Sequence, residues 1–228
     1  AVPMFLMMSN ILLKAGVGDD LFGFAQAWVG NFPGGLAIAT ILSCSIFAAI
    51  SGSSVATAAT ISTVAYPAMI KRGYHKNFCL GILAAGGTLG ILIPPSIMLI
   101  VYSVIAQLSP LRLFAAAIFP GLMLAGLYIV YAVTRAYLNP SIAPKPPAED
   151  IPPKGAILLE VLVSFVPLFG LIMLVLGTIL AGIATPAEAA AAGAFGALVL
   201  SYFYKTLKWN NFKESVFLTA KTTAMIMW

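Results

Sequence analysis

The sequence predicts an all-α, polytopic membrane protein, and three observations lead to that prediction. Hydrophobic residues make up 61% of the 228 residues and charged residues only 8%, with a mean hydropathy of +1.02, whereas a soluble domain needs far more charge on its surface. Uncharged runs of at least membrane length follow one another, at residues 21–69, 77–111, 113–134 and 161–187. The net charge of +5 lies in short connections between these runs, which indicates membrane topology and excludes a nucleic-acid-binding surface.

The first 35 residues predict the end of one membrane helix followed by an interfacial arm helix. Residues 1–14 are apolar up to Lys14, and Gly16 ends the helix. The stretch "DDLFGFAQAWVGNF" at 19–32 begins with acidic residues, which are favourable at a helix N-terminus, and mixes aromatic with polar residues as a helix on the membrane surface does. Because the sequence begins and ends inside apolar segments, we expect it to be part of a longer polypeptide.

The stretch 36–70 predicts a re-entrant helical hairpin. It is too long for one ordinary span, and the polar break "SGSS" at 51–54 divides it into arms of roughly 15 residues, each reaching about 22 to 24 Å. Because both arms fall short of a hydrocarbon core of about 30 Å, a hairpin is favoured over two spans. Its tip then lies near mid-membrane, where bare backbone is tolerated only inside protein or beside a water-filled cavity.

The next apolar run predicts a discontinuous spanning helix. Residues 77–88 are helix-like, "GILIPPS" at 90–96 interrupts the helix, and residues 97–106 resume it. Each of the two prolines lacks a backbone N–H donor and disfavours the helical conformation of the residue before it. This second break also falls near the middle of the membrane.

Further spans follow, and one of them begins with a recognisable cap. Thr185 is placed as N-cap, Pro186 as the first helical residue and Glu188 as the third, which is the capping-box pattern, so capping rather than proton transfer is predicted for Glu188. The predicted units are the end of a membrane helix with an arm helix (1–35), the hairpin and broken helix (36–106), a membrane helix (107–138), a cytoplasmic Pro-rich loop (139–155), two membrane helices (156–204), and a second arm helix with the start of a further membrane helix (205–228).

Positive charge gathers at three connections, and counting the predicted crossings places all three on one side. We assign that side to the cytoplasm. Residues 107–111 and 182–185 then face outward, with Arg112 as the one minority charge. The cytoplasmic charges are Lys71, Arg72, Lys76, Arg135, Lys145, Lys154, Lys205, Lys208 and Lys213.

The two breaks predict a site for a cation and an anion. Unpaired carbonyls are expected near residues 50–52 and 88–91, and unpaired N–H groups near 54–56 and 96–98. Carbonyl ends attract cations and N–H ends attract anions. Hydroxyl oxygens suit an alkali cation, and no intramembrane Asp or Glu is present for a tight divalent site. Broken helices of this kind bind substrate and coupling ion in secondary transporters. The hydroxyl groups belong to Ser51, Ser53, Ser54, Thr57, Thr88 and Ser96.

Four segments of the sequence resemble one protein family. They are "ISGSSVATAATISTVAYPAMIKRGY" at 50–74, "AAGGTLGILIPPSIMLIVYSV" at 84–104, "LFAAAIFPGLMLA" at 113–125 and "GIATPAEAAAAGAFGA" at 182–197. Together they closely resemble the large membrane subunit, permease M, of the TRAP (tripartite ATP-independent periplasmic) transporters of bacteria. The resemblance runs over nearly the whole chain. Since a full-length member has two inverted halves, the chain resembles most of the first half and the start of the second.

The resemblance implies an elevator-type secondary transporter, in which a hairpin and a discontinuous helix from each inverted repeat move against a static scaffold. It further implies sodium-coupled import of a C4-dicarboxylate or sialic-acid-like organic acid across the bacterial inner membrane. The implied partners are a periplasmic substrate-binding protein and a small, Q-type membrane subunit. By resemblance, Na⁺ is bound by Ser51, Gly52, Ser53, Ser54, Gly87, Thr88, Gly90 and Pro94. Because no Lys or Arg lies inside the apolar segments, the carboxylate is predicted at helix N-termini, beside Ser54, Thr57, Pro95 and Ser96.

Other interpretations remain open. The serines and glycine at 51–54 can serve close helix packing, and the two prolines can be a simple kink. A channel subunit would share the polar mid-membrane break, whereas an intramembrane serine hydrolase would need a base beside Ser53 or Ser54, and the only histidine, His75, is predicted to be a solvated connector residue. Cys44 and Cys79 lie in apolar segments and are read as buried small hydrophobes rather than as a disulfide or metal pair. The sequence has no Gly-rich phosphate-binding loop, so ATP use is not indicated. No enzyme activity is predicted.

Overall fold

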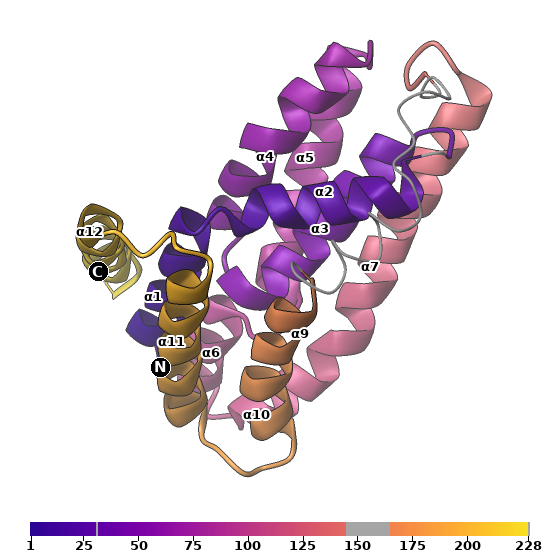
Figure 1. Ribbon diagram of the computed structural model, residues 1–228. Helices are drawn as coiled ribbons and strands as arrows, with labels where there is room; N and C mark the ends of the chain where they lie inside the picture. Colours follow the sequence, from indigo (N-terminus) through magenta and orange to yellow (C-terminus); the bar gives the residue numbers. More distant parts are fainter. Residues whose placement is uncertain (31, 145–164, 228) are drawn as a thin grey trace.

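The computed structural model describes residues 1–30, 32–144 and 165–227, and these residues are predominantly helical (Figure 1). Each major break follows a glycine, a proline or a polar cluster that the sequence already marked. The helices are α1 (Val2–Lys14), α2 (Val17–Val29), α3 (Gly35–Ser51), α4 (Ser54–Lys71), α5 (Lys76–Leu92), α6 (Ile97–Ile105), α7 (Pro110–Leu138), α9 (Val166–Ile172), the π-helical turn η3 (Met173–Gly177), α10 (Thr178–Leu180), α11 (Pro186–Phe203) and α12 (Trp209–Met227).

In the part of the chain that the structure describes, two helices, α7 and α11, are long and apolar enough to cross a membrane on their own. A third candidate span is the pair α5 and α6, which is bent by 44° at its break. The 29 residues of α7 correspond to about 43 Å of helix, enough to cross a hydrocarbon core with tilt. The first of the two membrane helices predicted within 156–204, at about 156–181, is described only from residue 165, where shorter apolar helices, α9 to α10, are found. Most of the predicted Pro-rich loop, 139–155, lies outside the described residues.

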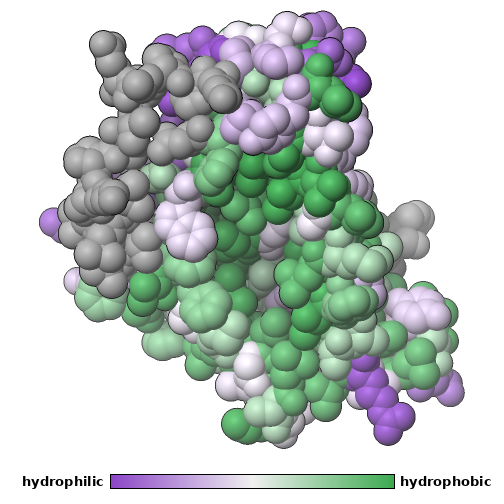
Figure 2. Space-filling model, turned by 90° about the vertical axis from the view of Figure 1, so that its right-hand side faces the viewer, coloured by the Kyte–Doolittle hydropathy of each residue, from purple (hydrophilic) through white to green (hydrophobic). Residues whose placement is uncertain are grey.

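Several connections and helix ends lie at two opposite ends of the bundle. In Figure 1, the α4–α5 connection and the C-terminal end of α7 lie at the top, and α11 runs upward to its end at Phe203. The α6–α7 and α10–α11 connections lie at the bottom. Figure 2 shows hydrophobic residues across the middle of one face and hydrophilic residues gathered at its top, above this apolar zone. This is the distribution expected of a protein whose middle is surrounded by lipid.

Helices α3 and α4 form a helical hairpin, with arms of 17 and 18 residues, or about 26 and 27 Å. Both open ends of the hairpin lie near the C-terminal end of α7. A side-chain carbon built on Gly34 would lie 2.9 Å from the Cβ of Ala136, and one on Gly73 would lie 3.7 Å from Pro144. The tip instead meets the α5–α6 break, whose Ile93 packs against Gly121 near the middle of α7. The hairpin therefore reaches about half the length of α7 and returns.

The predicted arm helix at 19–32 is α2, which begins at Val17 and ends at Val29. Asp19 and Asp20 lie in its first turn, as predicted. Figure 1 shows α2 running across α3, at a large angle to the long helices, and it packs against both α3 and α4. Its apolar side is buried through Leu21 and Phe22, while Trp28 is exposed.

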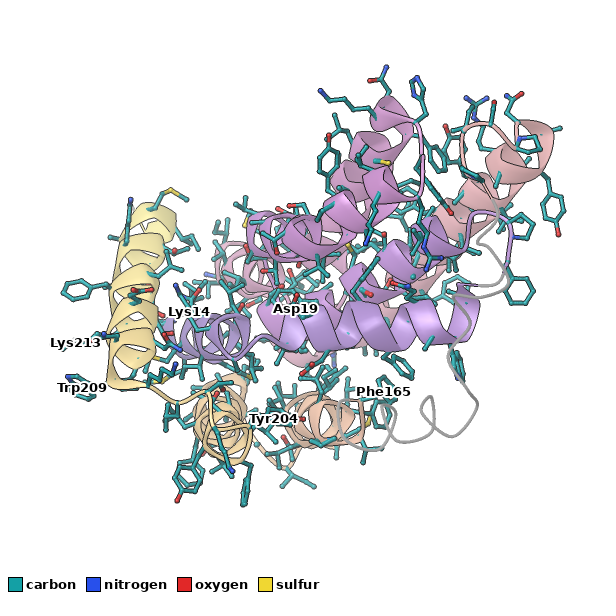
Figure 3. The ribbon with its side chains drawn as sticks, turned by 45° about the horizontal axis from the view of Figure 1, so that its top comes forward. Lys14, Asp19, Phe165, Tyr204, Trp209 and Lys213 are labelled. Atoms are coloured by element: carbon teal, nitrogen blue, oxygen red, sulfur yellow. The ribbon has the colours of Figure 1, made fainter. Side chains whose placement is uncertain are left out.

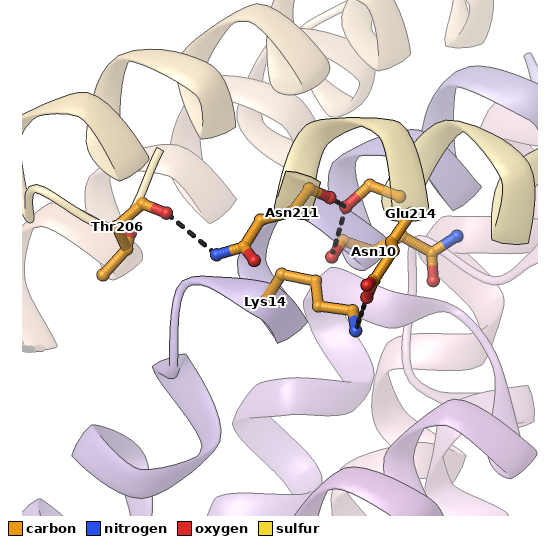
Figure 4. Close-up of polar contacts among 6 residues, drawn as sticks. Asn10, Lys14, Thr206, Asn211 and Glu214 are labelled. Atoms are coloured by element: carbon orange, nitrogen blue, oxygen red, sulfur yellow. Dashed lines mark hydrogen bonds and ion pairs between the residues drawn. The ribbon is translucent and has the colours of Figure 1, made fainter. Parts of the chain in front are cut away.

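Helix α12 packs on α1 through polar side chains (Figure 4). The Asn10 side-chain amide donates a hydrogen bond of 3.0 Å to the Thr219 hydroxyl, and the Ser215 hydroxyl donates one of 3.2 Å to the Asn10 carbonyl oxygen. Lys14 and Glu214 form an ion pair next to them. The arm helix was predicted at 205–220. Helix α12 begins four residues later, at Trp209, and continues without a break past residue 220 to Met227.

Candidate functional site

The Ser-Gly-Ser-Ser cluster forms the connection at the hairpin tip. Gly52 is the C-cap of α3 and has a left-handed backbone, with φ +58°, a conformation that glycine adopts without steric cost. Ser53 is the N-cap of α4, and its hydroxyl accepts a hydrogen bond of 3.4 Å from the Ala56 N–H, as is usual for a serine cap. The cluster thus ends one helix and begins the next within two residues.

The hairpin tip touches the break between α5 and α6 directly. The Ile97 N–H donates a hydrogen bond of 3.2 Å to the Gly52 carbonyl oxygen. A side-chain carbon on Gly52 would lie 2.6 Å from the Pro95 carbonyl oxygen, so no other residue fits this approach without movement of the backbone. The C-terminal end of α3 therefore lies against the N-terminal end of α6.

The reciprocal contact involves α5 and the first turn of α4. A side-chain carbon on Gly90 would lie 2.5 Å from the Ser53 carbonyl oxygen and 2.8 Å from the Ser54 nitrogen. One turn earlier, a side-chain carbon on Gly87 would lie 2.7 Å from the Cβ of Ala58. The glycines of α5 let its last turns pack onto the hairpin backbone, and four helix ends consequently meet in one place.

Hydroxyl groups brace the tip from inside. Ser51 Oγ and Thr57 Oγ1 lie 2.7 Å apart, and the Thr57 hydroxyl donates to the Ser53 carbonyl oxygen at 2.8 Å. Ser51 and Thr57 are fully buried, whereas Ser53 and Ser54 are half-buried. The Thr57 hydroxyl is therefore already occupied with holding the tip.

Ser96 differs from the other hydroxyl residues of the predicted site. It is the N-cap of α6 and is fully buried, yet its Oγ has no hydrogen-bond partner among the residues that the structure describes. A buried hydroxyl left unpaired costs about 1 to 3 kcal/mol, which makes it a feature that calls for an explanation. Its Cα lies 3.4 Å from where a side-chain carbon of Gly52 would be, so this unpaired group lies at the junction of tip and break.

The side chain of Thr88, one of the predicted site residues, contacts α7 rather than the tip. It is exposed, and its hydroxyl lies 2.6 Å from the Ala85 carbonyl oxygen, to which it donates, and 3.1 Å from the Tyr128 hydroxyl of α7. Helix α5 also continues to Leu92, four residues beyond the predicted end, so Gly90 is helical. Pro94 and Pro95 occupy the break itself and are buried.

The site carries no charged side chain. Residues 36–70 and 77–111 contain no Asp, Glu, Lys, Arg or His, and no group of three or more His, Cys, Asp or Glu residues that could hold a metal occurs in the described part of the chain. Its polarity comes from hydroxyl groups and from helix ends, two of which present carbonyls and two N–H groups. Such an arrangement suits a monovalent cation held by neutral oxygens and an anion held by N–H groups.

Two contacts of the site were missed by reasoning from the sequence. A side-chain carbon on Gly121 would lie 3.1 Å from the Ile93 side chain, so α7 closes over the break at a position where only a small residue fits. The Pro-Gly pair at 120–121 was the available signal for this contact. The Thr88–Tyr128 pair has no comparable signal, because nothing in the sequence sets the rotation of α5 against α7.

The arrangement separates the only histidine from the tip serines. His75 is exposed and follows the far end of α4 from Ser53, so the 18 residues of that helix, about 27 Å, lie between them. A base for a serine nucleophile must be within hydrogen-bond reach. Cys44 and Cys79 are buried and free, as predicted, and the capping box of Thr185 and Glu188 is also confirmed, with both reciprocal hydrogen bonds present.

The chain matches a sequence family described as the DctM component of the tripartite ATP-independent periplasmic transporter, over residues 1–228. It is 37% identical, over all of its length and 52% of the relative, to the C4-dicarboxylate TRAP transporter large permease protein DctM of Pseudomonas aeruginosa. It is 39% identical, over 91% of the chain and 45% of the relative, to the protein of the same description in Vibrio cholerae. The isethionate TRAP transporter permease protein DctMQ of Oleidesulfovibrio alaskensis is 37% identical over the whole chain and 35% of its own length.

The chain spans about half the length of the two C4-dicarboxylate permeases. The predicted resemblance is therefore confirmed, including its partial coverage. The matched proteins are membrane-embedded transporter permeases rather than enzymes. By family match and by identity along its whole length, the chain belongs to the DctM family, the large permease component of TRAP transporters.

Proposed function

We propose that the hairpin tip and the α5–α6 break form a sodium site of a secondary transporter that imports an organic acid across the bacterial inner membrane. The observation that carries the proposal is the meeting of four helix ends at Gly52, Ile97, Ser53 and Gly90, with the buried, unpaired hydroxyl of Ser96 at the same junction. An oxygen ligand with no protein partner fits a small, hard cation.

The residues offered to the ion are the hydroxyls of Ser51, Ser53, Ser54 and Ser96 and the carbonyls that end α3 and α5. The glycines at 52, 87 and 90 contribute by allowing the close approach of backbone. The N–H groups that begin α4, beside Ser54, are offered to a carboxylate of the solute, since the described site supplies no Lys or Arg. The Ile97 N–H is already bound to Gly52, which leaves the other N–H groups of the first turn of α6 for that role.

The transport path follows from the hairpin's reach. Because the hairpin enters and leaves at one end of α7 and its tip lies level with the middle of that helix, a membrane around α7 puts the site near mid-depth, with both helix breaks facing it. We propose that the hairpin and broken helix move as the carrier of an elevator. The solute is received from a periplasmic binding protein, and a small membrane subunit completes the complex. Fusion of M and Q in the name of the isethionate relative supports such a partner.

The proposal is tested by uptake into proteoliposomes that contain the complete permease complex and its binding protein. Radiolabelled C4-dicarboxylates and a panel of other organic acids are supplied under a sodium gradient or an equal potassium gradient. Accumulation above equilibrium is expected only with sodium and only with the binding protein. Uptake that needs neither, together with single-channel currents from the same complex, would replace the transporter by a channel.

A further inference from the structure

The connection that follows the apolar helix α11 forms a basic corner with two grooves. One groove, of about 360 Å³, is lined by Leu198, Leu207, Lys208, Trp209 and Phe212. The other, of about 350 Å³, is lined by Tyr202, Phe203, Lys205 and Leu207. Leu207 lines both grooves. We call Lys205–Phe212, with Leu198, Tyr202 and Phe203, the α11–α12 corner.

Hydrogen bonds within the connection and between α12 and α1 fix the shape of the corner. The Asn211 side-chain amide donates a hydrogen bond of 3.1 Å to the Thr206 carbonyl oxygen, and α12 is attached to α1 through the Asn10 and Glu214 contacts (Figure 4). Trp209 stacks on Phe212, with ring centroids 5.8 Å apart. The connection between α11 and α12 is thus fixed at Asn211 and by the contacts of α12 with α1.

The charge of the corner is positive. Lys205 and Lys208 each line one groove and are exposed, and no ion pair of either is found among the described residues. The nearby carboxylate of Glu214 is paired with Lys14. Lys213 lies over the Trp209 ring, 5.6 Å from its centroid, and both side chains lie on the side of α12 away from Lys14 (Figure 3). Lys205 and Lys208 are therefore available to bind an anion.

The position of the corner indicates a lipid as the source of that anion. The corner begins where the candidate span α11 ends, at Phe203, and Tyr202, Phe203 and Trp209 are all about 70% exposed, at 71%, 72% and 68%. Exposed aromatic side chains at the end of a span mark the depth of the lipid headgroups. The walls of both grooves are mainly apolar, which suits acyl chains better than a dissolved anion.

We propose that the α11–α12 corner binds an anionic phospholipid, with its phosphate between Lys205 and Lys208 and an acyl chain in each groove beside Leu207. A lysine at a membrane surface strengthens attraction to anionic lipid by about 1 kcal/mol, which is about fivefold in affinity. The site does not depend on the proposed sodium site, because the two share no residue.

The test is native mass spectrometry of the complete permease complex, titrated with phosphatidylglycerol or phosphatidylcholine of equal chain length. The wild-type complex is expected to retain phosphatidylglycerol about 25-fold better, since each of the two lysines contributes about fivefold. The Lys205→Gln/Lys208→Gln variant should lose that preference, whereas the matched variant Lys71→Gln/Lys76→Gln, which removes two exposed lysines at the α4–α5 connection, should keep it. Equal retention of both lipids by the wild type, or the same loss in both variants, would overturn the proposal.

A second measurement separates lipid from protein as the occupant. Leu207, which is 40% exposed, is replaced by cysteine in the complete complex, and the product is treated with a bifunctional cross-linker in the membrane. If lipid occupies the grooves, no polypeptide is cross-linked and a lipid-soluble maleimide labels the cysteine. Cross-linking of Cys at this position to the small subunit or to another segment of the permease would show a protein interface and overturn the proposal.

Discussion

The Ile97 N–H donates a hydrogen bond of 3.2 Å to the Gly52 carbonyl oxygen. This bond joins the first residue of α6 to the C-cap of α3, so the hairpin and the broken helix form one unit rather than two separate irregularities. The ends of α4 and α5 complete the unit through the contact of Gly90 with Ser53. Its geometry depends on backbone atoms that approach each other closely, which makes the glycines the most sensitive positions to test.

Gly90→Ala is expected to disrupt the contact between α5 and the hairpin. The added carbon would lie 2.5 Å from the Ser53 carbonyl oxygen, and because that neighbour is backbone, the helix must shift at a cost of about 1 to 3 kcal/mol. Uptake by the reconstituted complex should fall at least tenfold. Gly81→Ala in the same helix is the control, since nothing lies within 4 Å of the added carbon and alanine favours a helix by about 1 kcal/mol. Similar losses for both variants would refute the packing argument.

Gly52→Ala tests close approach separately from backbone strain. Gly52 and Gly182 both have positive φ, +58° and +71°, but only Gly52 has a near neighbour, 2.6 Å from the added carbon, whereas Gly182 has none within 4 Å. An alanine in the left-handed region costs each variant about 1 to 2 kcal/mol. In Gly52→Ala the steric clash adds to this cost. Uptake should therefore survive Gly182→Ala and be nearly lost in Gly52→Ala. Equal thermal stability and uptake in the two variants would show that the tip tolerates a side chain.

Ser96→Ala is expected to weaken sodium dependence without destabilising the protein. Its buried hydroxyl has no hydrogen-bond partner within the described ranges of the chain, so removing it relieves a penalty of about 1 to 3 kcal/mol when sodium is absent. If the hydroxyl is an ion ligand, the half-saturating sodium concentration should rise about tenfold. The loss of uptake should still be smaller than for Gly52→Ala, because the fold of the junction is kept.

Ser103→Ala is the matched control for Ser96→Ala. Ser103 lies on the same helix and is also buried, but its hydroxyl donates to the Ile100 carbonyl oxygen at 2.6 Å. Its loss should leave sodium dependence unchanged and lower the melting temperature slightly, since a satisfied hydrogen bond is removed. A Ser96→Ala complex that melts earlier in sodium-free buffer, with unaltered sodium dependence, would assign Ser96 a purely structural role.

The two breaks contain helix ends that could be predicted from the sequence and one that could not. The residues that end and begin helices could be predicted, because Gly52 and Ser53 have the chemistry of caps and the prolines at 94–95 cannot continue a helix. The end of α5 was placed four residues too early, at Thr88, because the break was taken to begin at Gly90, although the glycines of α5 all lie inside the helix. In the structure they permit close packing on the hairpin, so tertiary contact outweighs intrinsic preference at this point.

Contacts between helices that are far apart in the sequence could not be predicted, for a different reason. The polar side chains of α12 suggested a helix lying at the membrane surface, yet Ser215 and Thr219 are buried against α1. Polar residues along one side of a helix mark that side as different from the rest of its surface. Within lipid, the polar side packs against other protein segments. Without the partner helix in view, the same pattern equally fits a face turned to water.

The hydroxyls of Thr88 and Tyr128 form an exposed pair, 3.1 Å apart, between α5 and α7. Thr88→Val and Tyr128→Phe each remove one half of it. Because the Thr88 hydroxyl also donates to the Ala85 carbonyl oxygen, we expect both variants to behave alike, with a loss of stability of about 1 kcal/mol or less and the same half-saturating sodium concentration as the wild type. A sodium effect confined to Thr88→Val would instead place its side chain among the ion ligands.

The attachment of α12 to α1 should depend more on its buried hydrogen bond than on its ion pair. Asn10 is 6% exposed and donates to Thr219 at 3.0 Å, whereas the side chain of Glu214 is 62% exposed. An interhelical hydrogen bond in a membrane protein contributes about 0.6 to 1.7 kcal/mol, and an exposed ion pair about 0.2 to 1 kcal/mol, which salt screens. Asn10→Ala should therefore lower the melting temperature of the detergent-solubilised complex more than Glu214→Gln. Only the Glu214→Gln effect should vanish at high salt, and the reverse order would mean that water is excluded from the Lys14–Glu214 pair in the assembled complex.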